Sequence, residues 1–375
     1  MASPTTQTDT RMDARFMASA LALARRGLGR VAPNPAVGCV LVKDGRVIGR
    51  GWTQDGGRPH AETEALRRAG TAAKGATAYV TLEPCAHHGK TGPCVEALIN
   101  AGIKRVAVAL EDPDPRTKGQ GLALLRDAGI DVVLGIGRDE AARLNQGFFL
   151  KVEQGRPLFT LKLATTLDGR IATHRGESQW ITGAAARHYA HLLRATHDAV
   201  LVGALTAQID NPSLTCRLPG LESATPLRIV LDGRLRLPLT HDLVSTARKA
   251  PTLLITLPHA DHRRVHAYQE AGVEVSAVEP DEGGRPSASA LAKLLGARGL
   301  TRVLIEGGAT VAAAFLQAKL IDRLEWFRAA TLIGGDGIPA TAPFGVDHLV
   351  DAPGFIRTGL IDLGPDVLES FVRRD

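Results

Sequence analysis

The pattern of apolar positions near the start of the chain predicts a helix, a β-hairpin and then alternating helices and strands. Helical periodicity covers residues 11–26. Strands are expected over 37–42 and 47–52, on either side of Asp44-Gly45, a composition typical of a tight hairpin turn. Further helices are expected over 60–69, from 94 onward, and over 121–128 and 139–148, with strands over 78–82, 105–110 and 132–134. This order favours a mostly parallel sheet covered by helices.

A second series of strands and helices follows the segment 151–157, which is polar and contains Gly and Pro. Strands are expected over 158–164, 199–202, 227–231, 252–256, 273–277 and 302–305, with helices over 184–194 and 309–317 and a β-rich tail from Asp322. We therefore predict an α/β protein with two domains, over 11–150 and 158–375. Residues 151–157 would be the linker, and the polar residues 1–10 a disordered tail.

The composition is that of a globular chain, because 44% of its 375 residues are hydrophobic and 22% are charged. No apolar run approaches the roughly 18 residues of a membrane-spanning helix, so no membrane association is expected. The net charge of +6 comes without a run of Lys and Arg, and a small anionic substrate such as a phosphate ester explains it at least as well as nucleic acid does. Four cysteines are too few for a secreted disulfide framework, which favours the cytoplasm.

Two short motifs together predict a zinc site. His60-Ala61-Glu62 begins one expected helix, and Pro84-Cys85 follows a strand, with Cys94 after eight intervening residues. One imidazole and two thiolates leave the fourth position of zinc open for water, whose pKa the metal lowers to about 7. Because Glu62 lies two residues from His60, we expect it to carry the proton from that water to a leaving nitrogen.

Other interpretations of these residues stay open at this point. A structural zinc site would take a fourth ligand, which His87 or His88 could provide, and a free thiol is often just a small buried hydrophobe. Cys39 lies in an apolar strand and Cys216 lies far along the chain, so both are expected to be structural.

The sequence around the two motifs resembles the deaminase half of the bifunctional riboflavin-biosynthesis deaminase/reductase family. The similarity covers about residues 11–147 and lies in PNPAVG, HAETEAL, YVTLEPCAHHGKTGPC and AGIKRV. The long stretch between the two cysteines separates this family from cytidine and tRNA-adenosine deaminases. The resemblance implies a cytidine-deaminase-like three-layer α/β/α fold, with one zinc ion per chain on His60, Cys85 and Cys94 and with Glu62 as the catalytic residue.

The same resemblance implies that Asn34, His87 and Lys90 contact the deaminase substrate. A flexible lysine suits a phosphate group. The residues alone also allow simpler interpretations, since Asn34 between two prolines could form a turn and Lys90 could be a solvated loop residue.

The second half of the chain lacks the glycine fingerprint of a classical dinucleotide-binding domain. Residues 27–32 fit its loosest form, but they follow an expected helix and run into Pro33, so we reject this match. Glu306-Gly307-Gly308 and the later run 334–337 could bring backbone N–H groups close to a phosphate. As single signals they are weak, because Gly-Gly between a strand and a helix is usually only a tight connection.

The second half of the chain also resembles a known family. KLATTLDGRIAT, GESQWIT, LLRATHDAVLVGALTAQIDNPSLTCR, RIVLD and VLIEGGAT resemble the reductase half of the same family over residues 157–337. That half is similar to dihydrofolate reductase in fold. The resemblance implies that NADPH is contacted by Ala164, Trp180, Thr206, Asp210, Gly308, Ala309 and Thr310. It implies that the phosphoribosyl substrate is contacted by Lys162, Ser178, Arg194, Leu214, Arg217 and Glu306.

Some of these implied roles have a physical basis and a simpler alternative. Arg194 and Arg217 suit a phosphate clamp, and Lys162 and Asp210 are candidates to support proton delivery to the sugar oxygen. For Lys162 and Asp210 the simpler interpretations are a surface ion pair and a helix or turn cap. For Trp180 the simpler interpretation is core packing. The sequence also departs from the family: Thr166 replaces the more usual Ser, residues 327–330 replace an alanine-proline pair, and the match fades beyond Ile338.

The resemblance as a whole implies a cytoplasmic enzyme of riboflavin biosynthesis with two activities. The first half would deaminate 2,5-diamino-6-(5-phosphoribosylamino)pyrimidin-4-one, and the second would reduce the ribosyl chain to ribityl with NADPH. The expected partner is this small phosphoribosyl-pyrimidine, with no nucleic acid and no membrane, and the chain is expected to form a homo-oligomer, a dimer or tetramer. The sequence leaves two other classes open, a nucleic-acid base deaminase with an added binding domain and a non-catalytic zinc protein with a ligand-sensing half.

Overall fold

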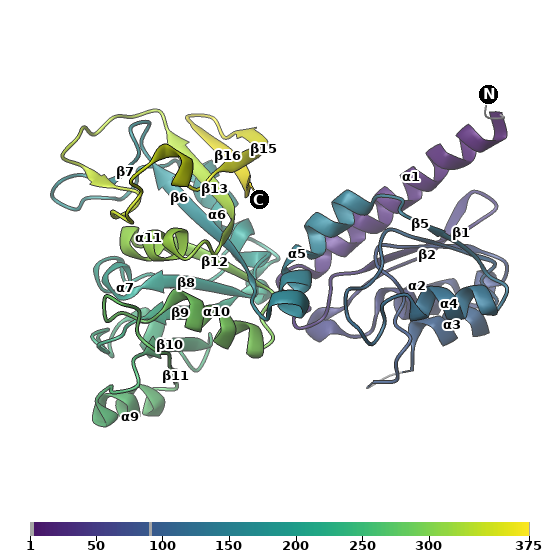
Figure 1. Cartoon of the computed structure of the whole chain (residues 1–375), viewed down its shortest axis with the longest axis horizontal. Coiled ribbons are helices and arrows are strands. Elements are labelled where there is room, and N and C mark those ends of the chain that lie inside the picture. Colours follow the sequence, from purple (N-terminus) through teal and green to yellow (C-terminus); the bar gives the residue numbers. More distant parts are fainter. Residues whose placement is uncertain (1–3, 90–91, 375) are drawn as a thin grey trace. The chain divides into compact units, whose positions relative to one another are not determined.

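The computed structural model describes the backbone of residues 4–89 and 92–374. The chain divides into two compact units, Met1–Gln154 and Gly155–Asp375, each with its own main sheet (Figure 1). The division falls within the segment 151–157 that was expected to be a linker. The helix α5 (Arg138–Gln154) extends to the end of the first unit, so the first four residues of that segment are helical.

The first unit contains a five-stranded sheet in the order β2-β1-β3-β4-β5. The expected hairpin of β1 (Gly38–Lys43) and β2 (Arg46–Trp52) is present, and β1 also pairs antiparallel with β3 (Thr77–Val80). The strands β3, β4 (Arg105–Val108) and β5 (Asp131–Leu134) are parallel. The helices are α1 (Pro4–Ala24), α2 (Ala61–Ala69), α3 (Cys94–Asn100), α4 (Gln120–Asp127) and α5, with 3₁₀ turns at Arg25–Gly27, Asp55–Gly57 and Gly70–Ala73.

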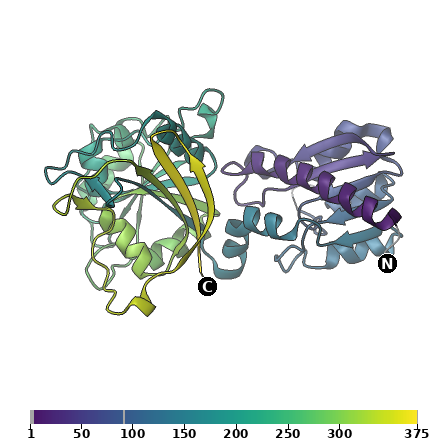
Figure 2. The same ribbon diagram turned by 90° about the horizontal axis from the view of Figure 1, so that it is seen from above.

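Alternate residues of β1 face two different helix layers, because neighbouring side chains in a strand point to opposite faces. Cys39 and Leu41 belong to a core shared with α2, α3 and α4, whereas Val40 and Val42 belong to a core shared with α1 and α5. In Figure 2 the purple α1 lies across one face of the sheet. The three-layer α/β/α fold that we predicted is therefore confirmed.

The helix α1 starts earlier than the apolar pattern indicated. It begins at Pro4 rather than at Arg11, so it includes residues 4–10, which we expected to be a disordered tail. The polar composition of these residues hides the helix, since they add no apolar face for periodicity to detect.

Glycines in the hairpin allow two helices to approach it closely. A Cβ on Gly38 would lie 1.9 Å from the Ala20 carbonyl oxygen in α1, and a Cβ on Gly51 would lie 2.1 Å from the Ala61 carbonyl oxygen in α2. Any side chain at either position would push its helix away. The contact at Gly51 matters for the predicted zinc site, because it fixes the start of α2, with His60 directly before the helix and Glu62 in its first turn.

The second unit contains a nine-stranded sheet in the order β11-β10-β9-β8-β12-β6-β13-β16-β15. The strands from β11 through β13 are parallel to one another, and β16 and β15 are antiparallel additions at one edge. The parallel strands are β6 (Leu158–Thr165), β8 (Ala199–Gly203), β9 (Leu227–Leu231), β10 (Thr252–Thr256), β11 (Glu274–Ala277), β12 (Arg302–Gly307) and β13 (Ile321–Ala329). The antiparallel strands are β15 (Phe355–Asp362) and β16 (Asp366–Arg373), and a small separate pair is formed by β7 (Arg170–Ala172) and β14 (Ile338–Pro339).

Helices cover both faces of this sheet. One core is shared with α10 (Ala288–Ala297) and α11 (Ala309–Gln317). The other is shared with α6 (Ala184–Ala195), α7 (Ala204–Asp210), α8 (Asp242–Ser245) and α9 (His262–Glu270); short 3₁₀ turns lie at Glu222–Ala224 and Leu349–Asp351. The predicted strands, the helices near 184–194 and 309–317 and the β-rich tail are confirmed. The sequence pattern missed α7 to α10 and the β7–β14 pair.

Candidate active sites

The first candidate site joins three residues from separate elements of the first unit. His60 precedes α2, Cys85 lies in the turn after β3, and Cys94 is the first residue of α3. The His60 Nδ1 atom is 3.4 Å from the Cys94 Sγ atom and 3.6 Å from the Cys85 Sγ atom. All three ligand atoms lie within 4.8 Å of one another. The arrangement matches the predicted set of one imidazole and two thiolates for zinc.

The local backbone favours a thiolate at Cys85. The Cys94 backbone N–H donates to the Cys85 Sγ atom at 3.3 Å, and the turn is closed by the Val95 N–H on the Cys85 carbonyl oxygen at 3.3 Å. Hydrogen bonds from Cys94 and from His60 lower the pKa of Cys85 to about 4. A thiol that ionises this readily is the form that binds a metal. Within the described ranges, neither His87 nor His88 joins the group, which argues against a four-ligand structural site.

Glu62 lies in the first turn of α2, beside this group, and is only 3% exposed. Burial, together with the nearby Cys85, raises the pKa of its carboxyl to about 7. A carboxyl with a pKa near neutrality can both accept and donate a proton at working pH. The donor set therefore fits zinc with one open position and an acid–base group next to it.

The predicted substrate residues of this unit occupy the loops nearby. Asn34 donates from Nδ2 to the Gly57 carbonyl oxygen at 3.0 Å, so one of its two amide hydrogens already braces the turn at Asp55–Gly57. His87 is half-buried, and a Cβ on Gly89 would lie 3.3 Å from the Arg58 guanidinium and 3.9 Å from the His87 Nδ1 atom. Lys90 lies outside the described residues.

Two residues near this site were missed in the sequence. Arg58 is close enough to affect the pKa of His60 electrostatically. Glu83, directly before Pro84-Cys85, is buried, and its carboxylate accepts from the backbone N–H groups of Asp112, Gly119, Gly121 and Leu122. The signal in the sequence was the acidic residue directly before Pro84-Cys85. Its hydrogen bonds tie the Cys85 turn to the start of α4.

The second candidate site lies in the second unit, at the carboxyl ends of its parallel strands. These ends meet at one edge, where open α/β sheets bind ligands. Lys162 in β6 and Glu306 at the end of β12 lie there together with the segment that follows β12. Burial lowers the pKa of Lys162, and the nearby Glu306 partly opposes this shift.

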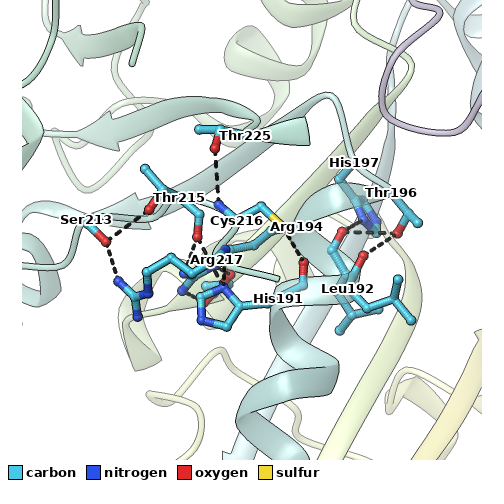
Figure 3. Close-up of polar contacts among 12 residues, drawn as sticks. His191, Leu192, Arg194, Thr196, His197, Ser213, Thr215, Cys216, Arg217 and Thr225 are labelled. Atoms are coloured by element: carbon cyan, nitrogen blue, oxygen red, sulfur yellow. Dashed lines mark hydrogen bonds and ion pairs between the residues drawn. The ribbon is translucent and has the colours of Figure 1, made fainter. Parts of the chain in front are cut away.

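Arg194, one of the predicted phosphate-binding residues, is already engaged by protein groups. Its Nη2 donates to the Glu306 Oε2 atom at 2.8 Å, its Nε donates to Oε1, and its Nη1 donates to the Thr215 carbonyl oxygen at 3.0 Å. Its side chain is only 13% exposed. Figure 3 shows Arg194, His191 and Arg217 gathered around the segment 213–217.

Arg217 differs from Arg194 because it is exposed. Its Nη1 donates to the Ser213 Oγ atom at 2.7 Å, and its backbone N–H lies 3.4 Å from the His191 Nδ1 atom. The predicted substrate residue Leu214 has a positive φ of 52° and is 2% exposed in the core. Its side chain is therefore not available to a ligand, although its backbone can be. The pattern did not single out His191, which lies on α6 with Arg194.

The predicted NADPH residues fall in three places. Ala164 lies near the end of β6. Thr206 of α7 packs on the glycines after β12, since a Cβ on Gly308 would lie 3.3 Å from the Thr206 Oγ1 atom. Gly308, with a φ of 93°, precedes α11, which Ala309 and Thr310 begin. Asp210 is the exposed last residue of α7.

Trp180 and Ser178 lie in the loop between β7 and α6. Trp180 is 68% exposed, and the Arg187 guanidinium carbon lies 4.8 Å from the centre of its ring. Core packing of Trp180, the simpler interpretation of this residue, is therefore wrong. An exposed aromatic ring held by a cation is available to a ligand.

Comparison with known proteins assigns both units. Residues 10–110 match the cytidine and deoxycytidylate deaminase zinc-binding region, and residues 157–363 match the RibD C-terminal domain. The chain is 41% identical to the riboflavin biosynthesis protein RibD of Bacillus amyloliquefaciens over 97% of both chains. It is also 41% identical to RibD of Escherichia coli, covering 95% of this chain and 98% of the other. The chain belongs to the RibD family.

Solved RibD structures agree with the whole fold. Form 1 of Acinetobacter baumannii RibD superposes with a TM-score of 0.87 at 39% identity, covering 98% of this chain and 100% of that chain. A Thermotoga maritima deaminase/reductase has a TM-score of 0.86 at 35% identity, with the same coverage. The chain is thus a bifunctional deaminase and reductase of riboflavin biosynthesis that uses zinc in the first unit and NADPH in the second. No described helix combines the length and the apolar character needed to cross a membrane.

Proposed function

We propose that the first unit deaminates 2,5-diamino-6-(5-phosphoribosylamino)pyrimidin-4-one to 5-amino-6-(5-phosphoribosylamino)uracil, and that the second unit reduces the ribosyl chain of this product. The Thermotoga maritima relative carries both activities in its name. The observation that carries the proposal is the convergence of His60, Cys85 and Cys94 next to the buried Glu62. Hydrolysis adds water to the ring carbon, breaks its bond to the amino group and releases ammonia.

His60, Cys85 and Cys94 are proposed to hold the zinc ion, which supplies Lewis acidity and a lowered pKa for bound water. Glu62 takes a proton from the attacking water and delivers it to the departing amino group. Its burial and its pKa near 7 support this role, because both protonation states are then accessible at neutral pH.

Asn34, His87 and Lys90 are proposed to bind the deaminase substrate, with Arg58 beside His87 as a further cation. Asn34 keeps one amide hydrogen beyond its bond to Gly57. The substrate is a phosphate ester, so positive charge beside His87 favours it.

In the second unit, hydride from NADPH is proposed to attack the first carbon of the ribosyl group, breaking its bond to the ring oxygen, which then takes up a proton. Lys162 is proposed to support that proton delivery together with Asp210, since burial lowers the lysine pKa and so makes proton release easier. The other proposed substrate residues are Ser178, Arg194, Leu214, Arg217 and Glu306. The proposed NADPH residues are Ala164, Trp180, Thr206, Asp210, Gly308, Ala309 and Thr310.

The test is incubation of the purified, zinc-loaded protein with the diaminopyrimidine phosphate, with and without NADPH, followed by mass analysis. Without NADPH we expect ammonia and a product in which one amino group is replaced by oxygen. With NADPH we expect that product to gain two hydrogens while NADPH is oxidised. An unchanged substrate in both reactions would contradict the proposal.

We also propose that the protein acts in the cytoplasm as a homo-oligomer, a dimer or tetramer. All four cysteines are free, and two of them are needed as thiolates, which suits a reducing compartment. The edge strand β15 exposes Ile356, Leu360 and Ile361, and a second copy of the chain could cover it. Light scattering after gel filtration tests this. A monomer at micromolar concentration would contradict it.

A further inference from the structure

The turn after β6 and the segment after β13 are bound together by their backbones. The Leu167 N–H donates to the Thr331 carbonyl oxygen at 2.9 Å, and the Ala340 N–H donates to the Gly169 carbonyl oxygen at 3.1 Å. The small β7–β14 pair continues this contact. The segment 331–342 is thereby held along the turn 166–169, although more than 150 residues separate them in the sequence.

The side chain of Asp168 in this turn accepts hydrogen bonds from the backbone of the segment. Its Oδ2 atom accepts the Gly334 N–H at 2.7 Å, and both carboxylate oxygens lie 3.3 Å from the Ile333 nitrogen. The Thr166 hydroxyl donates to Oδ1 at 2.5 Å. These bonds, with that from Thr166 first, lower the pKa of Asp168 to about 2. The carboxylate therefore remains ionised at any working pH.

The three glycines in the run 334–337 therefore have a different role from the phosphate contact that the sequence suggested. The N–H groups of Ile333 and Gly334 are committed to Asp168, and the Gly337 N–H donates to the Gly334 carbonyl oxygen at 3.2 Å. A Cβ on Gly337 would lie 2.7 Å from the Ile333 side chain. These glycines permit a tightly folded segment, and the committed N–H groups are not free for a phosphate.

The segment borders the NADPH side of the reductase site. It begins after β13, whose Phe327 pairs in register with Ala164. At its other end the Ala342 N–H donates to the carbonyl oxygen of Ala309, the first residue of α11, at 3.0 Å. The segment thus runs between two groups of residues that we assigned to NADPH.

We propose that Asp168 is a positioning residue for NADPH binding: by holding the Ile333 and Gly334 N–H groups, it fixes the segment 331–342 along the cofactor side of the site. Asp168 itself does not touch NADPH. The inference rests on the proposed assignment of Ala164 and Ala309 to NADPH. It adds a residue whose partners are the backbone N–H groups of Ile333 and Gly334.

The test compares Asp168→Asn with Asp336→Asn. Asp336 is a matched control, because it lies in the same segment, but its side chain is 71% exposed and lies 3.6 Å from His174. Asparagine keeps the shape of the side chain but loses the charge that strengthens both backbone bonds. We expect the Kd for NADPH, measured by NADPH fluorescence, to rise about tenfold in Asp168→Asn and to stay unchanged in Asp336→Asn.

Two further measurements separate positioning from general damage. The KM for NADPH should rise while the kcat and the KM for the pyrimidine substrate stay within about twofold, which general unfolding would not produce. Thr166→Val, which removes the hydroxyl bond to Asp168, should also raise the Kd for NADPH. Thr166→Ser keeps the hydroxyl and should bind NADPH as the wild type does. The proposal would be overturned by a wild-type Kd in Asp168→Asn. It would also be overturned if the KM for NADPH, the kcat and the KM for the pyrimidine substrate all worsened by the same factor.

The Kd readout also distinguishes this proposal from the proposed function. If the wild-type protein binds NADPH but does not reduce the deaminated substrate, the proposed reaction fails while the role of Asp168 is still judged from the Kd. If the wild-type protein does not bind NADPH, both fail.

Discussion

Arg194 and Glu306 form a buried, two-pronged ion pair that joins the last turn of α6 to the end of β12. The Nη2–Oε2 distance is 2.8 Å, and the side chains are 13% and 7% exposed. Burial alone would raise the pKa of the Glu306 carboxyl, but Arg194 and the nearby Lys162 outweigh burial and lower this pKa. Glu306 is thus held as a carboxylate with a fixed orientation at the reductase site.

The sequence suggested that Arg194 and Arg217 form one phosphate clamp, but only Arg194 is held in a buried ion pair. Arg217 is exposed and anchored only lightly, to Ser213 at 2.7 Å. We predict that Arg217→Ala raises the KM for the deaminated phosphate substrate about ten- to a hundredfold, because a charge-assisted hydrogen bond is lost. The KM for NADPH and the melting temperature should barely change. A rise in the KM for NADPH instead would mean that Arg217 faces the cofactor.

Arg194→Ala should behave differently, because it removes the partner of a buried carboxylate. Breaking a buried pair by deleting one member destabilises a protein by about 3–5 kcal/mol. We therefore expect a clear loss of melting temperature in the transition of the second unit, measured by calorimetry, with reductase activity lost in parallel. Glu306→Gln in the same background should return part of the stability, since it removes the unpaired charge. A variant with wild-type melting and a raised substrate KM would show that Arg194 acts on the substrate alone and that its ion pair with Glu306 contributes little to stability.

The clustering of His60, Cys85 and Cys94, the proposed zinc ligands, could be predicted from the sequence because the two motifs that carry them are local. His60-Ala61-Glu62 and Pro84-Cys85 each carry a recognisable residue set, and the strand and helix around each motif follow from short apolar patterns. Bringing the two motifs together needs only a parallel sheet with helices packed on it. Motif and fold therefore pointed to the same site.

The environment of the reductase residues could not be predicted, because it depends on partners far along the chain. Arg194 and Glu306 are 112 residues apart, and nothing near either residue indicates the other. Leu214 looked like a ligand contact from its motif, but its side chain is 2% exposed. Such burial depends on the tertiary packing around the nine-stranded sheet, and the spacing of residues in the sequence gives no information about that packing.

Glu62→Gln tests the proposed acid–base group of the first unit. The amide keeps the size of the side chain and is not needed as a ligand, so zinc should remain bound. Loss of a general acid–base group lowers the rate by about 10²–10⁴. We expect ammonia release to fall by that factor, while reduction of the deaminated intermediate with NADPH is unchanged. Near-normal ammonia release would rule out Glu62 as the proton carrier.

Serine substitutions at the four cysteines test the ligand set. A serine hydroxyl is a poorer zinc ligand than a thiolate, so Cys85→Ser and Cys94→Ser should lose zinc and deaminase activity. Cys39→Ser and Cys216→Ser are the matched controls, since both residues are buried but lie outside the ligand group. Burial raises the pKa of the Cys39 thiol well above its usual value, which keeps it neutral. Equal zinc contents in all four purified variants, measured by metal analysis, would show that the ligands are wrongly assigned.

Asp13 anchors α1 to the sheet of the first unit and gives a prediction for pH. Its carboxylate accepts two bonds from Arg105 in β4, at 2.7 and 2.8 Å, and one from the Tyr79 hydroxyl in β3 at 2.7 Å. Burial alone would raise the pKa of Asp13, but the bonds from Arg105 and Tyr79 outweigh it and lower the pKa. A carboxyl whose pKa is lowered by folding stabilises the fold above its unfolded pKa of about 3.9 and loses that contribution as the pH falls through the folded pKa.

We therefore predict that Asp13→Asn destabilises the first unit by about 1.5–3 kcal/mol at pH 7, because charged hydrogen bonds are lost. The difference from wild type should shrink as the pH falls below about 4, since the protonated aspartic acid then resembles asparagine. Asp131→Asn is the control: it contacts the same Arg105, at 3.2 Å, but is 66% exposed, so its effect should be small. Calorimetry of the zinc-loaded chain across this pH range measures both variants. A gap that is independent of pH, or an equal effect at Asp131, would show that α1 is held by apolar packing alone.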